Sequence, residues 1–523
     1  MTRAAIAVAA ALAVSACGPS RTVAVTPSAP ASARSPVEQL QADLSAIFET
    51  PQFERSFWSV LVRPAVSTGD LYSLNAAKLM MPGSAMKIVT VAAAAELLGW
   101  HHQFETKVVS VAPNDQGVLR GDLVVIGGGD PSISERSEVP GALRDIARKV
   151  RDAGITHIEG GVIGHDDLFD DNGFGNGWTL DNLPYGYAAA VSALEYNEGS
   201  VDLVIRAGAA AGDPVAIQVR PDGSGLHIDN RLITVAESGT GRVTLQRLPG
   251  SSRVVVQGQI PANAAPFART ASVDNPTAFF ASAFRDALIA EGILVNGDAV
   301  DIDDFLAKPD LGLARTLVLH KSPPLEQIAS SMMKVSQNQY AEMLLKAIGG
   351  REKAQDVLKS WDVASDSYVI ADGSGLSRYN YITSDALLRI LTRMRTDPKH
   401  AAAFAETLPV MGRDGTLSKR LAGTAAEGTV RAKTGTVDNV RAIAGYIDTA
   451  DGETLVFSII ANNFTVPTSV IDATVDRALI RLATFPDNPE GPENKSGSFS
   501  DDDWRKRIPI YFRTAFRHRY QGP

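Results

Sequence analysis

The amino-acid sequence predicts a mixed α/β protein in which one α/β domain is interrupted along the chain by a large β-rich insertion. A long apolar helix is predicted early, over residues 84–98. Short β-like runs separated by Gly, Asp and Pro then fill residues 104–302. Three strand-like runs and a closing helix follow at residues 429–482. Segments with the α/β pattern therefore precede and follow the β-rich segment.

The elements of the α/β domain can be predicted one by one from periodicity and turn residues. Residues 37–47 have helical periodicity. The apolar runs 58–62 and 71–74 flank a turn at residues 67–70, which predicts a hairpin. Helical periodicity returns at residues 324–348. Strand-like runs of the insertion include 123–126, 201–205, 216–219 and 254–256. The last part has strands near 429–433, 440–447 and 454–462 and a helix at 470–482.

A chain of 523 residues is too long for one hydrophobic core, so we expect several domains. The predicted segments are a signal peptide at 1–17, a flexible tether at 18–36, the α/β domain at 37–103 and 303–484, an inserted β-rich domain or pair of domains at 104–302, and a tail at 485–523. The net charge of −9 argues against a nucleic-acid partner, because binding to phosphates needs a basic surface. Neither composition nor charge predicts an oligomeric state.

The first residues have the pattern of an export signal. Arg3 gives a short positive start, residues 4–14 are apolar, and small residues lead to the chain's only cysteine, Cys17. Val14-Ser15-Ala16-Cys17 resembles the lipobox of bacterial lipoproteins, in which the cysteine is lipidated. This implies an exported, periplasmic protein that a lipid on Cys17 anchors to the membrane. The alternative is an ordinary signal peptide that is cleaved nearby, so that Cys17 is lost.

The predicted tail ends on a basic and aromatic segment. Residues 504–523 carry six Lys or Arg and no acidic residue, with aromatic residues between them. Such a segment could contact an anionic membrane or a polymer of the cell wall. The alternative is a tail that packs on its own domain or is disordered.

Two Ser-x-x-Lys tetrads occur, and only one has the setting of a nucleophile and its base. Ser84-Ala85-Met86-Lys87 follows the turn Pro82-Gly83 and opens the long apolar helix. Residues three apart lie on one face of a helix, so Lys87 is predicted beside the Ser84 hydroxyl. The helix N-terminus favours an alkoxide, and apolar surroundings favour a neutral amine that can accept a proton. The second tetrad, Ser331-Met332-Met333-Lys334, falls in the middle of a predicted helix.

Two further short motifs carry polar groups suited to a peptide substrate. Ser336-Gln337-Asn338 offers a hydroxyl for proton transfer and an amide that can orient a peptide. Lys433-Thr434-Gly435-Thr436 lies on a predicted strand, where the glycine allows a close backbone approach. Each motif alone has a structural alternative: a capping serine, a turn asparagine or a solvated strand lysine. Their occurrence together, in one order and with suitable local structure, favours a shared catalytic site.

The three motifs in this order resemble the signature of penicillin-binding proteins and serine β-lactamases. The long gap between Lys87 and Ser336 resembles the low-molecular-mass class C group, the D-Ala-D-Ala carboxypeptidases and endopeptidases of the penicillin-binding protein 4 type. Further matches are Gly127-Gly128-Gly129-Asp130-Pro131, Ile370-Ala371-Asp372-Gly373-Ser374-Gly375-Leu376-Ser377-Arg378 and Asp414-Gly415-Thr416-Leu417. The resemblance covers residues 37–483. It implies a serine β-lactamase/penicillin-binding-protein-like domain, in which helices flank an antiparallel sheet.

The resemblance also implies a role for each catalytic residue. Ser84 would be acylated by the carbonyl of the penultimate D-Ala of a peptidoglycan peptide. Lys87 would be its base. Ser336 would pass a proton to the leaving nitrogen, and Asn338 would hold both the peptide and Lys87. The acyl-enzyme would then be hydrolysed by water, with no metal or cofactor implied.

Substrate binding is implied for the third motif. Lys433, Thr434 and Thr436 would bind the terminal carboxylate. The backbone N–H groups of Ser84 and Thr436 would form the oxyanion hole. The implied partners are peptidoglycan peptides and β-lactam antibiotics, whose lactam bond mimics the D-Ala-D-Ala bond.

Two departures from the family pattern bear on substrate preference. Gln337 stands where relatives usually have Asp. Gly164-His165-Asp166-Asp167-Leu168-Phe169 stands where relatives often read Gly-Asp-Asp-Ser-x-Phe, whose first Asp lies near the amine of the peptide's third residue. His165 is therefore expected at that substrate position, with a weaker attraction for the amine. Adjacent residues rarely converge on one ion, so His165-Asp166-Asp167 does not predict a metal site.

Two other functions fit parts of the pattern. A serine β-lactamase shares the three motifs, but it would lack the insertion and would need a glutamate to activate water, which no motif supplies. A cell-wall scaffold lipoprotein with a vestigial site is the second alternative. No structural need explains the intact set Ser84, Lys87, Ser336, Asn338 and Lys433. We therefore predict a penicillin-sensitive serine D-alanyl-D-alanine carboxypeptidase or endopeptidase, with the balance between the two left open.

Overall fold

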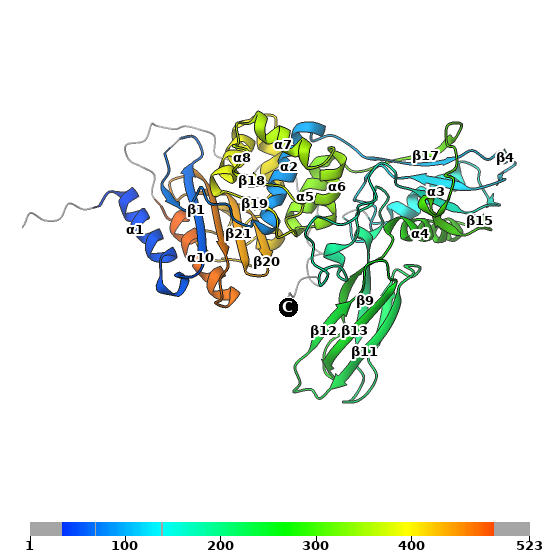
Figure 1. Ribbon diagram of the computed structural model, residues 1–523, viewed down its shortest axis with the longest axis horizontal. Coiled ribbons are helices and arrows are strands. Elements are labelled where there is room, and N and C mark those ends of the chain that lie inside the picture. The colour runs from blue at the N-terminus through cyan, green and yellow to red at the C-terminus, as the bar shows by residue number, and fades with distance from the viewer. Residues whose placement is uncertain (1–33, 68, 138–139, 486–523) are drawn as a thin grey trace, which may run out of the picture. The chain divides into compact units, whose positions relative to one another are not determined.

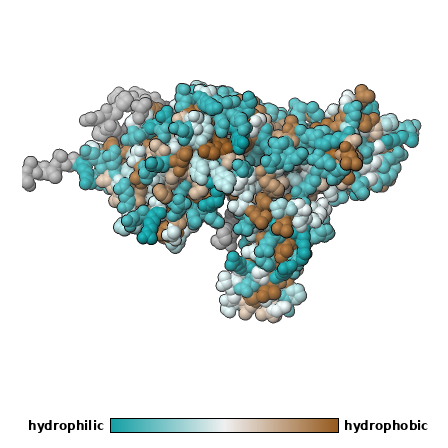
Figure 2. All heavy atoms as spheres, in the orientation of Figure 1, coloured by the Kyte–Doolittle hydropathy of each residue, from teal (hydrophilic) through white to brown (hydrophobic). Residues whose placement is uncertain are grey.

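The computed structural model of the chain describes residues 34–67, 69–137 and 140–485. Every helix and strand given below lies within residues 36–483. The predicted signal peptide with Cys17 and the basic tail lie outside the described residues. Among the helices of the described part, none is long and apolar enough to cross a membrane. Figure 2 shows apolar residues scattered among hydrophilic ones over one face of the molecule.

The α/β part is built on a five-stranded antiparallel sheet whose strands come from opposite ends of the described chain (Figure 1). In sheet order the strands are β2 (Tyr72–Leu74), β1 (Phe57–Pro64), β22 (Thr454–Asn462), β21 (Val440–Asp448) and β20 (Val430–Val437). β1 pairs with β22 along its whole length, from Phe57 opposite Asn462 to Pro64 opposite Leu455. The predicted hairpin and the three late strands are confirmed, and β20 forms an edge of their common sheet.

Helices cover both faces of this sheet, which explains why β21 and β22 are buried along almost their whole length. α1 (Pro36–Phe48) and α10 (Thr468–Ala483) pack on one face, around a core that includes Trp58 and Phe457. The opposite layer is centred on α2 (Lys87–Leu98), which is buried from Lys87 to Ala95. Around it lie α5 (Leu325–Val335), α6 (Asn338–Ala347), α7 (Arg351–Ser360), α8 (Ser384–Thr396) and α9 (Ala401–Thr407).

The insertion contains two sheets that mix parallel and antiparallel pairs, and two helices. The sheet orders are β16-β8-β6-β3-β17 and β15-β7-β5-β4. The strands are β3 (Glu105–Ser110), β4 (Asn114–Asp115), β5 (Val118–Leu119), β6 (Leu123–Ile126), β7 (His157–Ile158), β8 (Val162–His165), β15 (Leu294–Val295), β16 (Ala299–Asp301) and β17 (Arg315–Lys321). α3 (Ala142–Asp152) and α4 (Pro276–Ala290) pack against each other, and Phe280 and Phe284 of α4 are fully buried in the core of the insertion.

Two three-stranded sheets complete the insertion, in the orders β10-β9-β14 and β11-β13-β12 (Figure 1). Their strands are β9 (Ser200–Arg206), β10 (Ala216–Arg220), β11 (His227–Val235), β12 (Arg242–Gln246), β13 (Arg253–Pro261) and β14 (Phe267–Ser272). They share one hydrophobic core with α3 and α4, including Leu203, Val254 and Phe280. The β-rich texture predicted for this part of the chain is therefore present.

The strand pairing of the insertion extends beyond the expected boundary at residue 302. β17 pairs antiparallel with β3, and Lys321 stands opposite Glu105. Their side chains also form an ion pair, with 3.2 Å between Lys321 Nζ and Glu105 Oε1. The reason is geometric: the chain must leave an insertion close to where it entered, so its first and last strands lie side by side. Composition alone does not reveal this pairing.

Short elements complete the two parts of the chain. They are η1 (Pro51–Phe53), η2 (Gly83–Met86), η3 (Gly186–Ala188), η4 (Asn197–Gly199), η5 (Ile302–Asp304), η6 (Gly415–Leu417), β18 (Tyr368–Val369) and β19 (Tyr381–Ile382). η3 and η4, both in the insertion, contact α6 of the α/β part. The insertion therefore reaches the helix layer that carries the sequence motifs.

Candidate active site

Ser84 lies on the tight turn that opens the central helix. η2 holds residues 83–86, and α2 continues from Lys87. Gly83 has a φ of +51°, a conformation that favours glycine, and a Cβ there would come within 2.9 Å of the Thr436 backbone nitrogen. The turn can therefore lie against the edge of β20 because residue 83 has no side chain.

The Lys87 amine contacts the Ser84 hydroxyl, as the Ser-x-x-Lys spacing predicts. Its Nζ lies 2.9 Å from Ser84 Oγ, 2.7 Å from Asn338 Oδ1 and 2.8 Å from the Ser374 carbonyl oxygen. In a neutral amine, two hydrogens satisfy the amide and the carbonyl, and the lone pair is left for the Ser84 O–H. Burial lowers the pKa of Lys87 to about 7. The amine can therefore be neutral near pH 7, in position to accept the serine proton.

Ser336 and Asn338 lie at the junction of two helices. Ser336 ends α5 in the left-handed conformation, with a φ of +62°, and Asn338 is the first residue of α6. Gln337 between them is the N-cap of α6, and its side-chain oxygen accepts a hydrogen bond from the Gln339 N–H at 3.3 Å. An amide oxygen can cap a helix as a carboxylate does. Gln337, at the position where relatives usually have Asp, can therefore cap α6 in the same way.

Lys433 brings a second buried amine into the cluster. Its Nζ donates to Ser336 Oγ and to the Thr434 carbonyl oxygen, each at 2.8 Å. Burial lowers the pKa of Lys433 well below the usual lysine value, and the nearby Lys87 lowers it further. An anion bound beside Lys433 would favour its charged form. The Ser336 hydroxyl therefore lies next to a group that can exchange a proton with it.

The edge of β20 is covered at one end and open at the other. At the covered end, the Ala432 N–H donates to the Pro409 carbonyl oxygen at 2.9 Å. N–H groups alternate in direction along a strand, so those of Thr434 and Thr436 point to the same edge. Thr434 is partly exposed and Thr436 is exposed. From residue 433 onward, the strand can therefore accept an extended peptide along this edge.

The part of β20 with the open edge packs against the Ser84 turn. Gly435 makes this approach possible, since a Cβ on it would overlap the Pro82 carbonyl oxygen and come within 3.1 Å of the Ser84 nitrogen. The backbone nitrogens of Ser84 and Thr436 are therefore close neighbours across this contact. Two N–H groups beside a nucleophilic hydroxyl are the arrangement of an oxyanion hole.

Two backbone carbonyls complete the site, and sequence reasoning missed both. The Ser374 carbonyl accepts from Lys87, as described above. The Tyr187 carbonyl, on η3 of the insertion, accepts from Asn338 Nδ2 at 2.8 Å. The side-chain amide of Asn338 therefore links Lys87 to the insertion: its oxygen accepts from Lys87, and its nitrogen donates to Tyr187. A backbone acceptor leaves no signal in residue type, so no motif could have indicated these two carbonyls.

A buried acid beneath the site was also missed. Glu342 of α6 accepts hydrogen bonds from the backbone N–H groups of Gly373 and Ser374, at 3.0 and 2.8 Å. Burial, together with the negative charge of Asp372, raises the pKa of Glu342 to about 8. Asp372 in turn accepts from Trp178 Nε1 of the insertion at 2.8 Å. Glu342 thus fixes the two peptide groups before the Ser374 carbonyl, and Asp372 Oδ1 accepts from the Gly375 N–H of the peptide group whose carbonyl binds Lys87.

The structure brings most of the predicted site residues together. Two hydrogen-bonded groups form one cluster: Lys87 binds Ser84 and Asn338, and Lys433, close enough for the charge of Lys87 to act on it, binds Ser336. Thr434 and Thr436 lie along the adjoining strand edge. His165 is not part of it: in the described ranges, no hydrogen bond or ion pair joins His165 to this cluster. The residue ends β8, and its Nδ1 is buried with no hydrogen-bond partner among the described residues.

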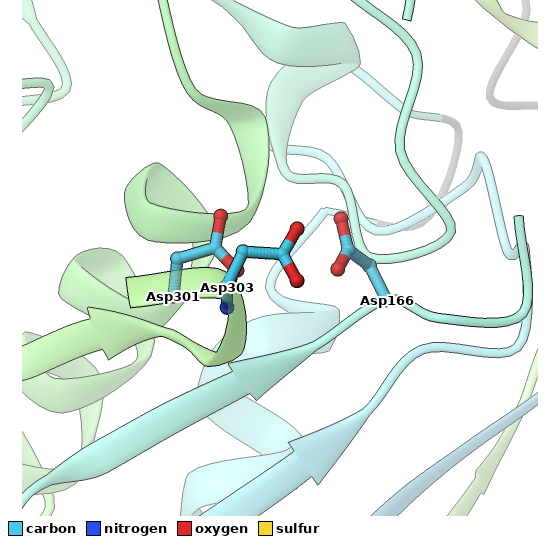
Figure 3. A group of neighbouring side chains, drawn as sticks. All are labelled: Asp166, Asp301 and Asp303. Atoms are coloured by element: carbon cyan, nitrogen blue, oxygen red, sulfur yellow. Dashed lines mark hydrogen bonds between the residues drawn. The ribbon is translucent and has the colours of Figure 1, made fainter. Parts of the chain in front are cut away.

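Asp166, next to His165, belongs to an acidic group within the insertion. The carboxylates of Asp166, Asp301 and Asp303 turn toward one another, with oxygen atoms within 4.8 Å (Figure 3). Lys308 Nζ lies 2.6 Å from Asp303 Oδ1, and Asn275 Nδ2 donates to Asp301 Oδ2 at 2.7 Å. The Lys308 contact offsets part of the negative charge, and the Asn275 contact ties the start of α4 to Asp301 at the end of β16. We assign the group a structural role.

The arrangement is similar to that of known proteins in sequence and in fold. The sequence profile of the D-Ala-D-Ala carboxypeptidase 3 (S13) family matches residues 40–482. The chain is 34% identical to the D-alanyl-D-alanine carboxypeptidase of Actinomadura sp. (strain R39), over 88% of this chain and 87% of that protein. It is 27% identical to the D-alanyl-D-alanine carboxypeptidase DacB of Haemophilus influenzae, over 75% and 82%. The crystal structure of penicillin binding protein 4 from Haemophilus influenzae matches with a TM-score of 0.73 at 25% identity, over 84% of this chain and 98% of that chain.

Proposed function

The chain belongs to the D-Ala-D-Ala carboxypeptidase 3 (S13) family, and we propose that Ser84 is the nucleophile with which it opens D-alanyl bonds. The protein is a serine-type hydrolase that acts as a D-alanyl-D-alanine carboxypeptidase or endopeptidase on peptidoglycan. The observation that carries the choice of Ser84 is the 2.9 Å contact between its hydroxyl and the buried Lys87 amine. Ser331, the serine of the other tetrad, lies within α5, and the lysine of that tetrad binds Asp414.

Acylation begins when the neutral Lys87 amine takes the Ser84 proton. Ser84 Oγ then forms a bond with the carbonyl carbon of the penultimate D-Ala, and the carbonyl oxygen becomes an oxyanion. The N–H groups of Ser84 and Thr436 stabilise it, and one such donor typically lowers the barrier by about 3 kcal/mol. Peptide alignment along the edge of β20 places the carbonyl between the hydroxyl and these donors.

Collapse of this intermediate breaks the C–N bond and needs a proton on the leaving nitrogen. The Ser336 hydroxyl supplies it, and Lys433, 2.8 Å away, returns a proton to Ser336. Lys433, Thr434 and Thr436 bind the carboxylate of the departing D-Ala. The proton held by Lys87 then returns to Lys433 through solvent, so that Lys87 is neutral and Lys433 charged again. Water attacks the acyl carbonyl carbon, Lys87 accepts a proton from this water, and the proton passes to Ser84 Oγ as the acyl–oxygen bond breaks. The same steps serve when the leaving amine belongs to a cross-linked peptide, which would make the reaction an endopeptidase cleavage.

Penicillin is the reagent that tests the choice of nucleophile. The penicillin binding protein 4 of Haemophilus influenzae, 25% identical to this chain, forms a complex with a β-lactam. We expect a fluorescent penicillin to label this protein once, with a mass increase of one penicillin. Ser84→Ala should abolish the label, and Ser331→Ala should retain it. Labelling that persists in Ser84→Ala, or that disappears only in Ser331→Ala, would refute the assignment.

We also propose that the protein is exported to the periplasm and anchored by a lipid on Cys17. Support comes from the lipobox-like sequence Val14-Ser15-Ala16-Cys17 and from the cell-wall substrate. Cys17→Ala should move the protein from the membrane fraction to the soluble exported fraction. A wild-type protein that is already soluble, with its N-terminus beyond Cys17, would contradict the anchor. The role predicted for His165, at the peptide's third residue, stays a prediction.

A further inference from the structure

A pocket of about 440 Å³ lies between the end of α1 and the start of β1, on the face of the five-stranded sheet that α1 covers (Figure 1). Its lining includes Phe48 at the end of α1, Phe53 of η1 and Trp58 of β1. Of the described residues, none that the reaction above uses lines this pocket. The volume is ordinary for a ligand site. The pocket is therefore separate from the active site and large enough for a small ligand.

Two polar atoms of the pocket lining are buried and have no hydrogen-bond partner among the described residues. They are Trp58 Nε1 and Thr50 Oγ1. Trp58 is only 3% exposed. Thr50 is the N-cap of η1, yet its side chain does not accept the hydrogen bond that threonine often accepts at a helix N-terminus. An unpaired buried polar group destabilises a fold, so such groups are nearly always bonded in native proteins. Both atoms therefore point to a molecule that binds in the pocket.

The indole of Trp58 is held in place by its neighbours. Its ring centroid lies 5.0 Å from that of Phe48 and 5.3 Å from that of Phe53. The side-chain amide of Asn75, which also lines the pocket, donates to the Trp58 carbonyl at 2.9 Å and does not accept from the indole. The indole N–H is thus a donor in a fixed position, and a ligand has to bring the acceptor to it.

The charge of the pocket selects among possible ligands. Among the described lining residues, the charged ones are Glu49 and Glu54, and both are exposed. Two carboxylates attract a cation and repel an anion. The acceptor that Trp58 and Thr50 require is therefore a neutral oxygen, such as a carbonyl. A primary ammonium group beside a neutral carbonyl, carried on a short hydrocarbon unit, is the amino end of a peptide.

We propose that this pocket binds a peptide by its free amino end. The terminal ammonium group contacts the carboxylates of Glu49 and Glu54. Carbonyl oxygens near that end accept hydrogen bonds from Trp58 Nε1 and from the Thr50 hydroxyl. This is a second peptide site on the protein, and it does not depend on the assignment of Ser84 or on the reaction at that residue.

The first experiment observes Trp58 directly in the full-length protein. With isotope-labelled tryptophan, each indole N–H gives its own NMR signal, and Trp58→Phe identifies the signal of Trp58. Alanyl-alanine amide should shift this signal until it saturates. The N-acetylated form of the same peptide, which lacks the positive charge, should bind about fivefold more weakly. Protein treated with penicillin should respond in the same way, because the pocket is separate from the active site.

Several results of this titration would overturn the proposal. If no probe shifts the Trp58 signal, the pocket holds water alone. If the N-acetylated peptide binds as tightly as the free amine, the carboxylates do not recognise an ammonium group. If N-acetylglucosamine shifts the signal and the peptide does not, the ligand is a saccharide. A response that penicillin abolishes would place the peptide in the active site instead.

The second experiment removes single groups of the pocket and measures Kd by calorimetry, which keeps the test valid if Trp58→Phe does not fold. Thr50→Val removes the hydroxyl and keeps the shape of the side chain, and Glu54→Gln removes one charge. Each should raise the Kd of alanyl-alanine amide about fivefold. Glu54→Gln should leave the Kd of the N-acetylated peptide unchanged.

Glu159→Gln, which removes an exposed charge in the insertion, is the matched control and should keep the wild-type Kd. Thermal melts show whether each variant folds. Penicillin should still label Thr50→Val and Glu54→Gln, because neither residue belongs to the reaction. A wild-type Kd for alanyl-alanine amide in either folded variant would overturn the proposal, whatever the outcome of the Ser84 experiments.

Discussion

Lys87 is the residue on which the chemistry depends most, because it has to be neutral to act as a base. An ordinary lysine is protonated at pH 7 and could not accept the Ser84 proton. Full burial in α2 moves its pKa to about 7. Asn338 Oδ1 and the Ser374 carbonyl then hold the two hydrogens of the neutral amine. The same contacts leave the lone pair directed to Ser84.

We therefore expect penicillin acylation to speed up with rising pH as Lys87 loses its proton, and to level off above about pH 7. Lys87→Arg should abolish acylation, because a guanidinium stays charged at these pH values. The measurement is the second-order acylation rate between pH 5 and pH 9. Lys359→Arg, an exposed substitution on α7, serves as the control. A flat pH profile, or near-normal acylation by Lys87→Arg, would contradict a neutral lysine base.

At the scale of elements, the site depends on the contact between the η2 turn and the edge of β20. Gly83 on the turn and Gly435 on the strand allow the two backbones to approach each other. This contact brings the N–H groups of Ser84 and Thr436 together, although more than three hundred residues separate them in the sequence. The oxyanion hole is therefore a property of how a strand packs against a turn.

Gly435→Ala should separate these two elements. The added Cβ would overlap the Pro82 carbonyl oxygen, so β20 must move away from the turn. We expect acylation by penicillin to slow by about 100-fold, since the loss of one oxyanion donor costs about 3 kcal/mol. Gly69→Ala is the matched control, because nothing lies within 4 Å of its new Cβ. Stopped-flow rates and near-UV circular dichroism would be compared, and a wild-type rate in Gly435→Ala would contradict this account.

At the scale of the whole molecule, buried polar groups join the insertion to the catalytic helix α6. Gln339 Nε2 donates to the Ala190 carbonyl at 2.9 Å and lies 3.4 Å from Glu195 Oε1. Gln339 follows Asn338, which itself binds the Tyr187 carbonyl. Burial raises the pKa of Glu195 to about 8, and the Ser192 N–H opposes this shift. The junction is therefore built around a carboxyl group that is protonated at neutral pH.

This junction should make stability depend on pH. Between pH 4.5, the ordinary value for glutamate, and about 8, the folded state keeps a Glu195 proton that the unfolded chain releases. The contribution is therefore present in full below pH 4.5 and is lost as pH rises through about 8. Over this window, wild type should lose on the order of 2 kcal/mol or more relative to Glu195→Gln, which cannot ionise.

The test is the free energy of unfolding by denaturant at pH 5 and pH 9, for wild type and Glu195→Gln. Glu159→Gln, an exposed substitution in the same insertion, is the control and should follow wild type. An equal pH dependence in wild type and Glu195→Gln would show that this carboxyl group is not protonated in the folded protein.

Local patterns predict much of this molecule because they depend on neighbours in the sequence. The three-residue spacing of Ser84 and Lys87 places both on one helical turn, whatever surrounds it. The hairpin of β1 and β2 and the three late strands follow from alternation and turn residues. The conjunction of three short motifs also indicates the catalytic cluster. These features do not depend on contacts between distant segments of the chain.

The tertiary structure decided what depends on contacts between distant segments. The pairing of β17 with β3, the carbonyls of Ser374 and Tyr187, and the position of Thr416 beside Thr434 are such contacts. Backbone acceptors carry no residue-type signal, and burial, which sets the pKa of Lys87, depends on the packing of a whole helix layer. The sequence by itself determined which groups could react, and the fold determined their surroundings, because solvation and long-range packing are properties of the assembled chain.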